Sequence, residues 1–340
     1  MAADNRQKIK LMKLYEFLRK ETDEQHPISR IRLCRQMNEM GISSNVRTLS
    51  LDIKVLNDNG YQVLSYMKDK ERFFYVAERE LNVPELRILL DALQAASFIT
   101  ERKTAELVEK VAALGGSHRA ELLKKNLVCF NTRKHSNEAI FYTVDGIEDA
   151  IFRKKKITFN YFHLNENVER SYVLTENGER KRYCAEPVAL IYNEDNYYLM
   201  ACTERHPDTA GIYRIDRIDH LEILEESELS NAALEMTARV TEFTEQAIKM
   251  YGGEPEEVVL RFDRSLVEPV FDRFGENTPM RRFDEDTCTA AVRVRISPTF
   301  FGWLAQFGGS MRVLSPENVR ESFREHIRLA LEAERGGPEV

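Results

Sequence analysis

The sequence predicts a multidomain α+β protein. Its 340 residues exceed the usual domain size of about 100–150 residues and indicate two or three domains. Apolar residues recur at helical spacing in the first part of the chain, short alternating runs follow, and strands and helices are mixed toward the end. Hydrophobic residues make up 43% of the chain and charged residues 31%, a balance typical of folded domains.

Residues 1–79 are expected to contain three helices. The first carries an apolar stripe at positions i, i+3, i+4 and i+7. Ser29 is suited to cap a second helix that runs to about Met40. A third helix starts near Ser44 and ends at Gly60, because glycine tolerates a positive φ at a helix end. The apolar residues of the first and third helices are Leu11, Leu14, Tyr15, Leu18, Val46, Leu49, Ile53 and Leu56.

A β-hairpin is expected to follow these helices. Two stretches with alternating apolar residues, Gln62–Tyr66 and Arg72–Val76, flank the basic tip Lys68-Asp69-Lys70. Two short helices joined at Gly41 form a helix-turn-helix pattern, in which the second helix enters the major groove of DNA. The head, residues 1–79, is therefore predicted to be a winged helix-turn-helix DNA-binding domain.

The distribution of charge favours this interpretation. The whole chain carries −7, which argues against nucleic-acid binding. The head, however, holds 15 Lys/Arg and 11 Asp/Glu, a net of +4, whereas the rest of the chain carries −11. A small helical bundle with a solvated polar face remains the alternative. The residues expected to contact DNA are Ser44, Asn45, Arg47, Thr48, Lys54, Lys68 and Lys70.

Residues 80–139 are expected to form a helical linker or dimerisation region. The chain favours helices from Pro84 onward, with a break at Gly115-Gly116-Ser117 and a further helix to about Val128. Leu86, Leu89, Leu90 and Leu93 give the first of these helices an apolar stripe. The stripe could pack on the protein's own core or form the seam of a homodimer, which many helix-turn-helix proteins need to bind palindromic sites.

Residues 140–228 are expected to form a small β-barrel. A short helix at Ile147–Arg153 precedes a strand in which Ile157, Phe159 and Tyr161 alternate with polar residues. Several short strands within about 70 residues are typical of a small barrel. The further strands are expected at Glu169–Leu174, Arg182–Tyr192, Tyr197–Cys202 and Ile212–Ile218.

Two segments of this region resemble the WYL domain of bacterial transcriptional regulators. They are EPVALIYNEDNYYLMAC and IYRIDRIDHLEIL. Tyr197-Tyr198-Leu199 stands where that family has Trp-Tyr-Leu, and the change keeps an aromatic residue. The stretch Tyr213–Ile218 is similar to the second signature of the family. The resemblance extends to the head, through RTLSLDIKVLNDNGY, and to a WCX-type C-terminal extension from about Glu257 to Leu331.

This resemblance implies a Sm-like or SH3-like barrel that senses a ligand and controls the DNA-binding head. The implied ligand is a nucleotide or single-stranded nucleic acid, which guanidinium groups and aromatic rings bind well. Tyr198, Arg214 and Arg217 match motif positions, and Asp216 is expected either to orient an arginine or to form a plain surface pair with Arg214. In a regular strand Arg214 and Arg217 face opposite sides, so both line one pocket only if the strand bends. The ligand-binding candidates are Tyr161, Arg182, Tyr183, Tyr198, Arg214, Asp216 and Arg217.

The last third of the chain is expected to form a connecting helix and one further domain. Residues 229–254 contain a helix near Val240–Tyr251 and a linker rich in glycine. Residues 255–335 show the β-α-β-β-α-β order of a ferredoxin-like domain. The only tryptophan, Trp303, lies in the helix Pro298–Phe307 and is expected to serve packing. A second contact surface for the effector or for a partner subunit is the expected role of this domain.

Several classes of function are not expected. The sequence has no P-loop, GxGxxG or GxSxG motif and no recognisable catalytic triad, so we expect neither an enzyme nor a cofactor. The five scattered cysteines predict reduced thiols without a zinc site. The sequence shows no secretory signal and no run of about 20 apolar residues that could span a membrane. We expect a cytoplasmic homodimer that binds double-stranded DNA; the alternative is an interaction adaptor or enzyme-regulating module without sequence-specific DNA binding.

Overall fold

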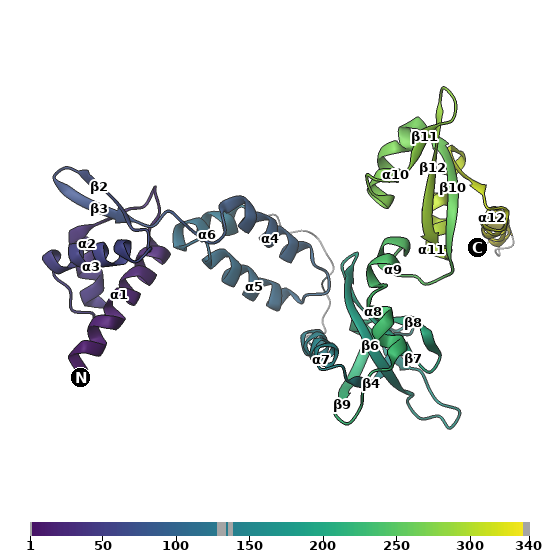
Figure 1. Cartoon of the computed structure of the whole chain (residues 1–340), viewed down its shortest axis with the longest axis horizontal. Coiled ribbons are helices and arrows are strands. Elements are labelled where there is room, and N and C mark those ends of the chain that lie inside the picture. The colour runs from purple at the N-terminus through teal and green to yellow at the C-terminus, as the bar shows by residue number, and fades with distance from the viewer. Residues whose placement is uncertain (1, 128–133, 135–138, 336–340) are drawn as a thin grey trace. The chain divides into compact units, whose positions relative to one another are not determined.

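The computed structural model describes residues 2–127, 134 and 139–335, and shows a mixed α/β protein. Its described part contains twelve α-helices and three β-sheets, and Figure 1 labels most of the helices and strands. The chain divides into two compact units, Met1–Glu138 and Ala139–Val340. Cys129 and the end of the expected linker at 128–133 and 135–138 lie outside the described residues.

The head contains the expected helices and hairpin, together with one additional strand. Ser29 caps the second helix, because its side chain accepts a hydrogen bond from the Arg32 N–H. Asp69 and Lys70 take positive φ values of 51° and 64° in the tight turn of the hairpin. The short first strand pairs with the third, giving the sheet order β1-β3-β2. The elements are α1 (Ala2–Glu21), β1 (Ile28–Ser29), α2 (Arg30–Glu39), α3 (Val46–Asp58), β2 (Leu64–Lys68) and β3 (Glu71–Tyr75).

Three helices follow in the same unit: α4 (Val83–Ala95), α5 (Glu101–Ala113) and α6 (Ser117–Lys125). Leu86 and Leu90 of α4 are fully buried against α5 and α6. Two residues of the predicted apolar stripe, Leu86 and Leu90, therefore serve the core of these helices, whereas Leu89 is 43% exposed. Helix α4 ends at Ala95, and Thr100 caps the start of α5.

The helices α4–α6 are attached to the head where α6 begins. Gly116 has a φ of +87°, and a Cβ at this position would lie 3.0 Å from the Lys20 carbonyl oxygen of α1. The Ser117 hydroxyl donates a hydrogen bond of 3.0 Å to the Glu21 carboxylate. The glycine pair that the sequence marked as a break is thus the place where α6 packs closely against the end of α1.

The second unit begins with α7 (Ile140–Phe152) and a six-stranded antiparallel sheet. The strand order is β5-β4-β6-β7-β8. Strand β9 pairs with β4 along the edge opposite β6. Among the described strands no ladder joins β8 to β9 or β5, so the expected small β-barrel takes the form of a half-barrel. The strands are β4 (Lys156–Leu164), β5 (Arg170–Tyr172), β6 (Arg182–Asn193), β7 (Asn196–Thr203), β8 (His206–Arg214) and β9 (Ile218–Leu224).

The expected strand Ile212–Ile218 is interrupted. Strand β8 ends at Arg214, and a turn of 3-10 helix at Ile215–Arg217 leads into β9. Ile215 is 1% exposed, so its burial holds this turn in place. The turn sends the chain from the edge of the sheet back to β4, which explains why β8 and β9 do not form one strand.

The helix expected near Val240–Tyr251 is α9 (Val240–Gln246), which ends earlier, and an additional helix, α8 (Asn231–Thr237), precedes it. These helices cover one face of the half-barrel. Phe243 of α9 is buried in the same cluster as Met200 and Tyr198 of β7. The apolar residues of β7 that point to this face therefore form a core with the connecting helices.

The C-terminal domain has the expected β-α-β-β-α-β element order, with a four-stranded antiparallel sheet of order β11-β12-β10-β13. Its helices pack on one face of the sheet, where Leu260, Phe262 and Phe300 are almost fully buried. Trp303 packs edge-to-face against Phe274 and Phe307, as its expected packing role requires. The elements are β10 (Pro255–Asp263), α10 (Val267–Phe274), β11 (Met280–Arg282), β12 (Thr287–Arg295), α11 (Pro298–Ala305), β13 (Met311–Ser315) and α12 (Glu317–Arg335).

Candidate functional sites

The turn between α2 and α3 is held by side-chain hydrogen bonds. The Asn38 amide donates to the Ser44 carbonyl at 2.9 Å and accepts from the Ser44 N–H at 3.0 Å. The Asn45 side-chain oxygen accepts from the Arg47 and Thr48 N–H groups and caps α3. Of the predicted DNA-contacting residues, Ser44 and Asn45 therefore shape the turn, and Asn38 is a residue of this turn that the sequence analysis missed.

The exposed face of α3 carries the other candidates of this helix. Arg47 and Lys54 are exposed, and their spacing of seven places them two turns apart on one face. Leu51 lies between them and is 64% exposed. Its apolar side chain can contact thymine methyl groups in a major groove. The Thr48 hydroxyl donates to the Asn45 carbonyl, so it is partly engaged in the cap.

The tip of the hairpin presents Lys68 and Lys70 to solvent. Both are suited to phosphate contacts beside the groove that α3 would enter. Further exposed cations that the sequence analysis did not select lie on α2 and β3, and each follows helix or strand periodicity that is visible in the sequence. They are Arg32, Arg35 and Arg72.

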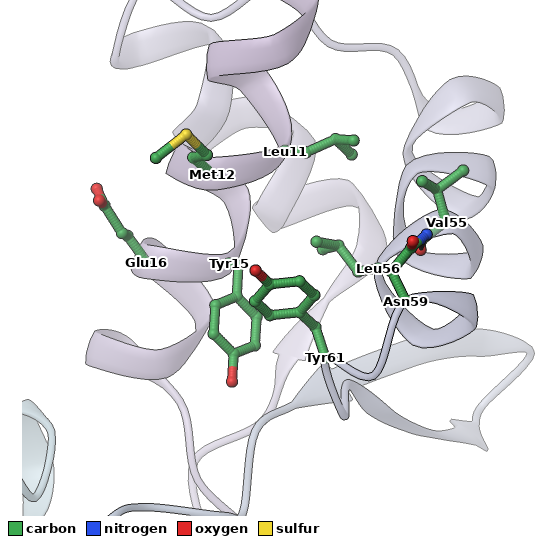
Figure 2. Close-up of a pocket in the computed structure, with 8 residues that line it drawn as sticks. All are labelled: Leu11, Met12, Tyr15, Glu16, Val55, Leu56, Asn59 and Tyr61. Atoms are coloured by element: carbon green, nitrogen blue, oxygen red, sulfur yellow. Dashed lines mark hydrogen bonds between the residues drawn. The ribbon is translucent and has the colours of Figure 1, made fainter.

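A hollow of about 490 Å³ lies between α1 and the C-terminal end of α3. Figure 2 shows the rings of Tyr15 and Tyr61 at one end of it, with Leu11 and Met12 on the side of α1. Its lining contains no lysine or arginine. The hollow therefore does not belong to the cationic face of α3.

The half-barrel contains an aromatic cluster, formed by Phe159, Tyr161, Tyr183 and Tyr213. Phe159 is fully buried and stacks on Tyr183 at a centroid distance of 5.5 Å. Tyr213 packs edge-on against both Phe159 and Tyr161. The three tyrosines are partly exposed, so their rings and hydroxyls are available beside the buried phenylalanine. The sequence analysis missed Phe159 and Tyr213, whose alternation with polar residues indicated only a core role.

Arg214 is fixed in a hydrogen-bonded fork. Its guanidinium donates to both carboxylate oxygens of Asp216, at 3.0 and 2.8 Å, and to the Asn196 side-chain oxygen at 2.6 Å. These bonds to Asp216 raise the pKa of Arg214 above its ordinary value. Asp216 thus orients Arg214, as expected, and both side chains are partly buried rather than forming a loose surface pair.

The 3-10 turn brings Arg217 to the aromatic cluster. The Tyr161 hydroxyl accepts a hydrogen bond of 3.2 Å from the Arg214 backbone N–H. Burial raises the pKa of Tyr161, whereas the Arg214 N–H and the neighbouring Arg217 guanidinium oppose the rise. Both arginines therefore lie close to Tyr161, which a continuous strand would have prevented.

Tyr198 and Arg182 do not contribute to the exposed surface of the aromatic cluster. Tyr198 is 8% exposed and packs in the core beneath α9, and burial raises its pKa. Arg182 lies next to Tyr183 along β6 and so faces the opposite side of the sheet. There it bonds Thr158, the His220 carbonyl and Glu222. Arg182 and Tyr183, both predicted ligand-binding residues, therefore lie on opposite faces of the sheet.

Two domain models match the sequence: a WYL domain at residues 142–223 and a WCX domain at residues 254–331. The chain therefore contains a WYL domain and a WCX domain. These matches confirm the resemblance to the WYL domain and to the WCX-type extension that the sequence motifs indicated. The aromatic cluster and the Arg214 fork lie within the WYL domain, and the four-stranded sheet lies within the WCX domain.

Solved structures of low sequence identity are also similar to this WYL-domain protein. Proteasome accessory factor B/C (PafBC) of Arthrobacter aurescens is 19% identical, with a TM-score of 0.28, over 95% of this chain and 48% of that chain. This chain therefore spans about half the length of PafBC. A CRISPR Cas-related protein is 14% identical, with a TM-score of 0.38, over 89% of this chain and 77% of that chain. A search of curated proteins finds no match. None of the described helices is both long and apolar enough to cross a bilayer.

Proposed function

We propose that this WYL-domain protein is a transcriptional regulator that binds double-stranded DNA with its head and responds to an effector at its WYL domain. The exposed Arg47–Leu51–Lys54 face of α3 is the observation that carries the proposal. It lies on the second helix of a helix-turn-helix, whose turn is fixed by Asn38 and Asn45. The proposal includes no catalytic activity.

The double variant Arg47→Ala/Lys54→Ala is expected to weaken binding to the duplex upstream of the protein's own coding region by about thirtyfold or more. Each lost contact to a base or phosphate costs roughly 1–3 kcal/mol, and each lost phosphate contact lowers the salt slope by about one. Fluorescence anisotropy of the full chain over a range of salt concentrations measures both quantities.

A matched control removes the same charge from another surface of the head. Lys13 and Lys20 lie exposed on α1, and Lys13→Ala/Lys20→Ala is expected to change affinity less than threefold. Equal affinity of the wild type and the α3 variant would rule out α3 as the recognition helix. An adaptor that does not bind DNA would show no salt-sensitive affinity in either protein.

The effector in this proposal is a nucleotide or single-stranded nucleic acid that stacks on the tyrosines of the aromatic cluster and pairs with Arg217. Stacking on aromatic rings and bidentate bonds to guanidinium are the interactions that bases and phosphates form best. Arg214 is already committed to Asp216 and Asn196, so it supports the site by fixing the turn that carries Arg217.

Tyr183→Ala and Arg217→Ala are each expected to weaken binding of a fluorescein-labelled dT15 oligonucleotide by about fivefold or more. The control is Arg182→Ala, which removes an arginine next to Tyr183 but from the opposite face of the sheet. Anisotropy titration measures the affinities, and thermal unfolding checks that each variant is folded. An equal loss in the control and in Arg217→Ala would contradict the site.

The proposal also includes a homodimer formed through α4. Ile88 is 69% exposed and Leu89 is partly exposed on this helix, although Leu86 and Leu90 are used internally. Light scattering coupled to size exclusion is expected to give twice the mass of 39.6 kDa, and Ile88→Asp/Leu89→Asp is expected to return the mass to that of one chain. If the wild type is monomeric at micromolar concentration, the proposed homodimer is ruled out.

A further inference from the structure

The open face of the WCX sheet carries a row of arginines. In the pairing register Arg281 of β11 lies opposite Thr289 of β12, Thr289 lies opposite Arg261 of β10, and Arg261 lies opposite Arg312 of β13. Directly opposed residues of an antiparallel sheet point to the same face. The row therefore crosses all four strands of the sheet, of which Figure 1 labels β10, β11 and β12.

This row is on the face that the helices of the domain leave uncovered. The neighbouring positions Leu260, Phe262 and Met311 are 0–2% exposed and form the core with the helices. Alternation along the strands places Arg261 and Arg312 on the other side. Helix α9 reaches that side only at the far end of β12, where Arg293 pairs with Glu242 and Arg295 lies over Phe243.

The charges of the row are only partly compensated. Arg261 pairs with Asp284 at 2.6 Å. Within residues 2–127, 134 and 139–335, no ion pair or side-chain hydrogen bond holds the guanidinium of Arg281 or Arg312, and both residues are exposed. Like charges placed directly opposite one another across strands destabilise a sheet, and Arg261 and Arg312 are such a pair. An anion bound along the row would remove this repulsion.

An aromatic ring completes the surface. Phe283 is 54% exposed, and the guanidinium of Arg261 lies over its ring at 4.2 Å. The WCX residues 254–331 contain eleven arginines and no lysine. Arginine binds phosphate in a bidentate manner and also stacks on flat rings.

We propose that this face is a binding platform for single-stranded nucleic acid, with phosphates on Arg281, Arg261 and Arg312 and a base stacked on Phe283. A single strand fits because its bases are free to stack on an exposed ring, whereas the bases of a duplex are not. The strands of a sheet are about 4.8 Å apart, so the row extends over roughly 14 Å, which is enough for more than one phosphate. The platform is separate from the aromatic cluster of the WYL domain and from α3.

The test uses the full chain and a fluorescein-labelled dT15 oligonucleotide that carries one 5-iododeoxyuridine. Arg281→Ala/Arg312→Ala is expected to weaken binding about tenfold and to lower the salt slope by about 1.4, which is 0.7 for each lost phosphate contact on a single strand. Phe283→Ala is expected to weaken binding about fivefold. Ultraviolet crosslinking followed by peptide mass spectrometry is expected to place the adduct on the peptide that contains Phe283.

Arg324 and Arg335 are exposed on α12, and Arg324→Ala/Arg335→Ala is the charge-matched control, expected to bind within twofold of the wild type. Unchanged affinity in Arg281→Ala/Arg312→Ala together with a crosslink elsewhere overturns the platform. If Arg217→Ala abolishes binding while the platform variants do not, the WYL site holds the oligonucleotide alone and the platform is again excluded. Complete competition by polyglutamate at equal charge would assign the face to an acidic peptide instead.

Discussion

Phe159→Ala is expected to lower the free energy of unfolding of the WYL domain by about 3–5 kcal/mol, the usual cost of removing a buried phenylalanine. Phe159 is fully buried at the base of the aromatic cluster. Its ring stacks on Tyr183 and contacts the edge of Tyr213. Because these tyrosines rest on Phe159, the variant is also expected to lose affinity for the oligonucleotide.

Native-state hydrogen exchange measures this loss domain by domain. Peptides from β4 and β6 are expected to exchange about 100-fold to several thousand-fold faster in Phe159→Ala, because each 1.4 kcal/mol corresponds to a factor of ten. The control is Phe152→Ala at the end of α7, where the ring is 86% exposed and removal should change stability by about 0.5 kcal/mol or less. Equal exchange in the two variants would contradict the core role of Phe159.

Gly253→Ala is expected to destabilise the WCX domain by about 3 kcal/mol or more. Gly253 has a φ of +150°, and a Cβ there would lie 2.1 Å from the Ile296 carbonyl oxygen. Conformations of this kind cost a residue with a side chain roughly 1–3 kcal/mol, and the overlap with a backbone oxygen must also be relieved. The Ile296 N–H donates to the Glu254 carbonyl at 3.0 Å, so relief would separate the start of β10 from the end of β12.

The fluorescence of Trp303 reports this effect without interference, because it is the only tryptophan and lies in α11 of the WCX domain. A urea titration of Gly253→Ala is expected to show a lower midpoint with an unchanged slope. Gly252→Ala is the neighbouring control, since a Cβ at Gly252 meets no atom within 4 Å. Identical midpoints for the two variants would show that β10 and β12 adjust to the methyl group.

The head illustrates how far the sequence could predict a binding surface. The positions of α1–α3 and of the hairpin follow from apolar spacing, caps and turn residues, and the exposed Arg47 and Lys54 follow from the same spacing. The role of Asn45 did not, because the sequence shows a polar residue at a helix start but not which hydrogen bond its side chain forms. In a sequence, a polar residue that caps a helix cannot be distinguished from one that contacts a DNA base unless the first residue of the helix is known.

In the WYL domain the sequence identified candidate residues but not how they are arranged in space. The two signatures identified the domain, and the same residues suggested Arg214, Asp216 and Arg217. Whether Arg214 and Arg217 lie near one another depends on the 3-10 turn at Ile215–Arg217, and the alternation of a strand pattern does not reveal where a strand ends. A related reason applies to Arg182. Its neighbour along β6, Tyr183, points to the other face of the sheet, so adjacency in the sequence does not place the two side chains together.

The sequence by itself determined the order of the domains, most helices and strands, and the reversal of charge between the head and the rest of the chain, because these properties depend on residues that are close together along the chain. Only the tertiary structure decided that the WYL sheet is a half-barrel, that Phe159 supports Tyr183 and Tyr213, and that Arg281, Arg261 and Arg312 form one row. Those features depend on strand pairing and register between distant segments. Local patterns do not specify that register, because it is fixed by how the buried faces pack together.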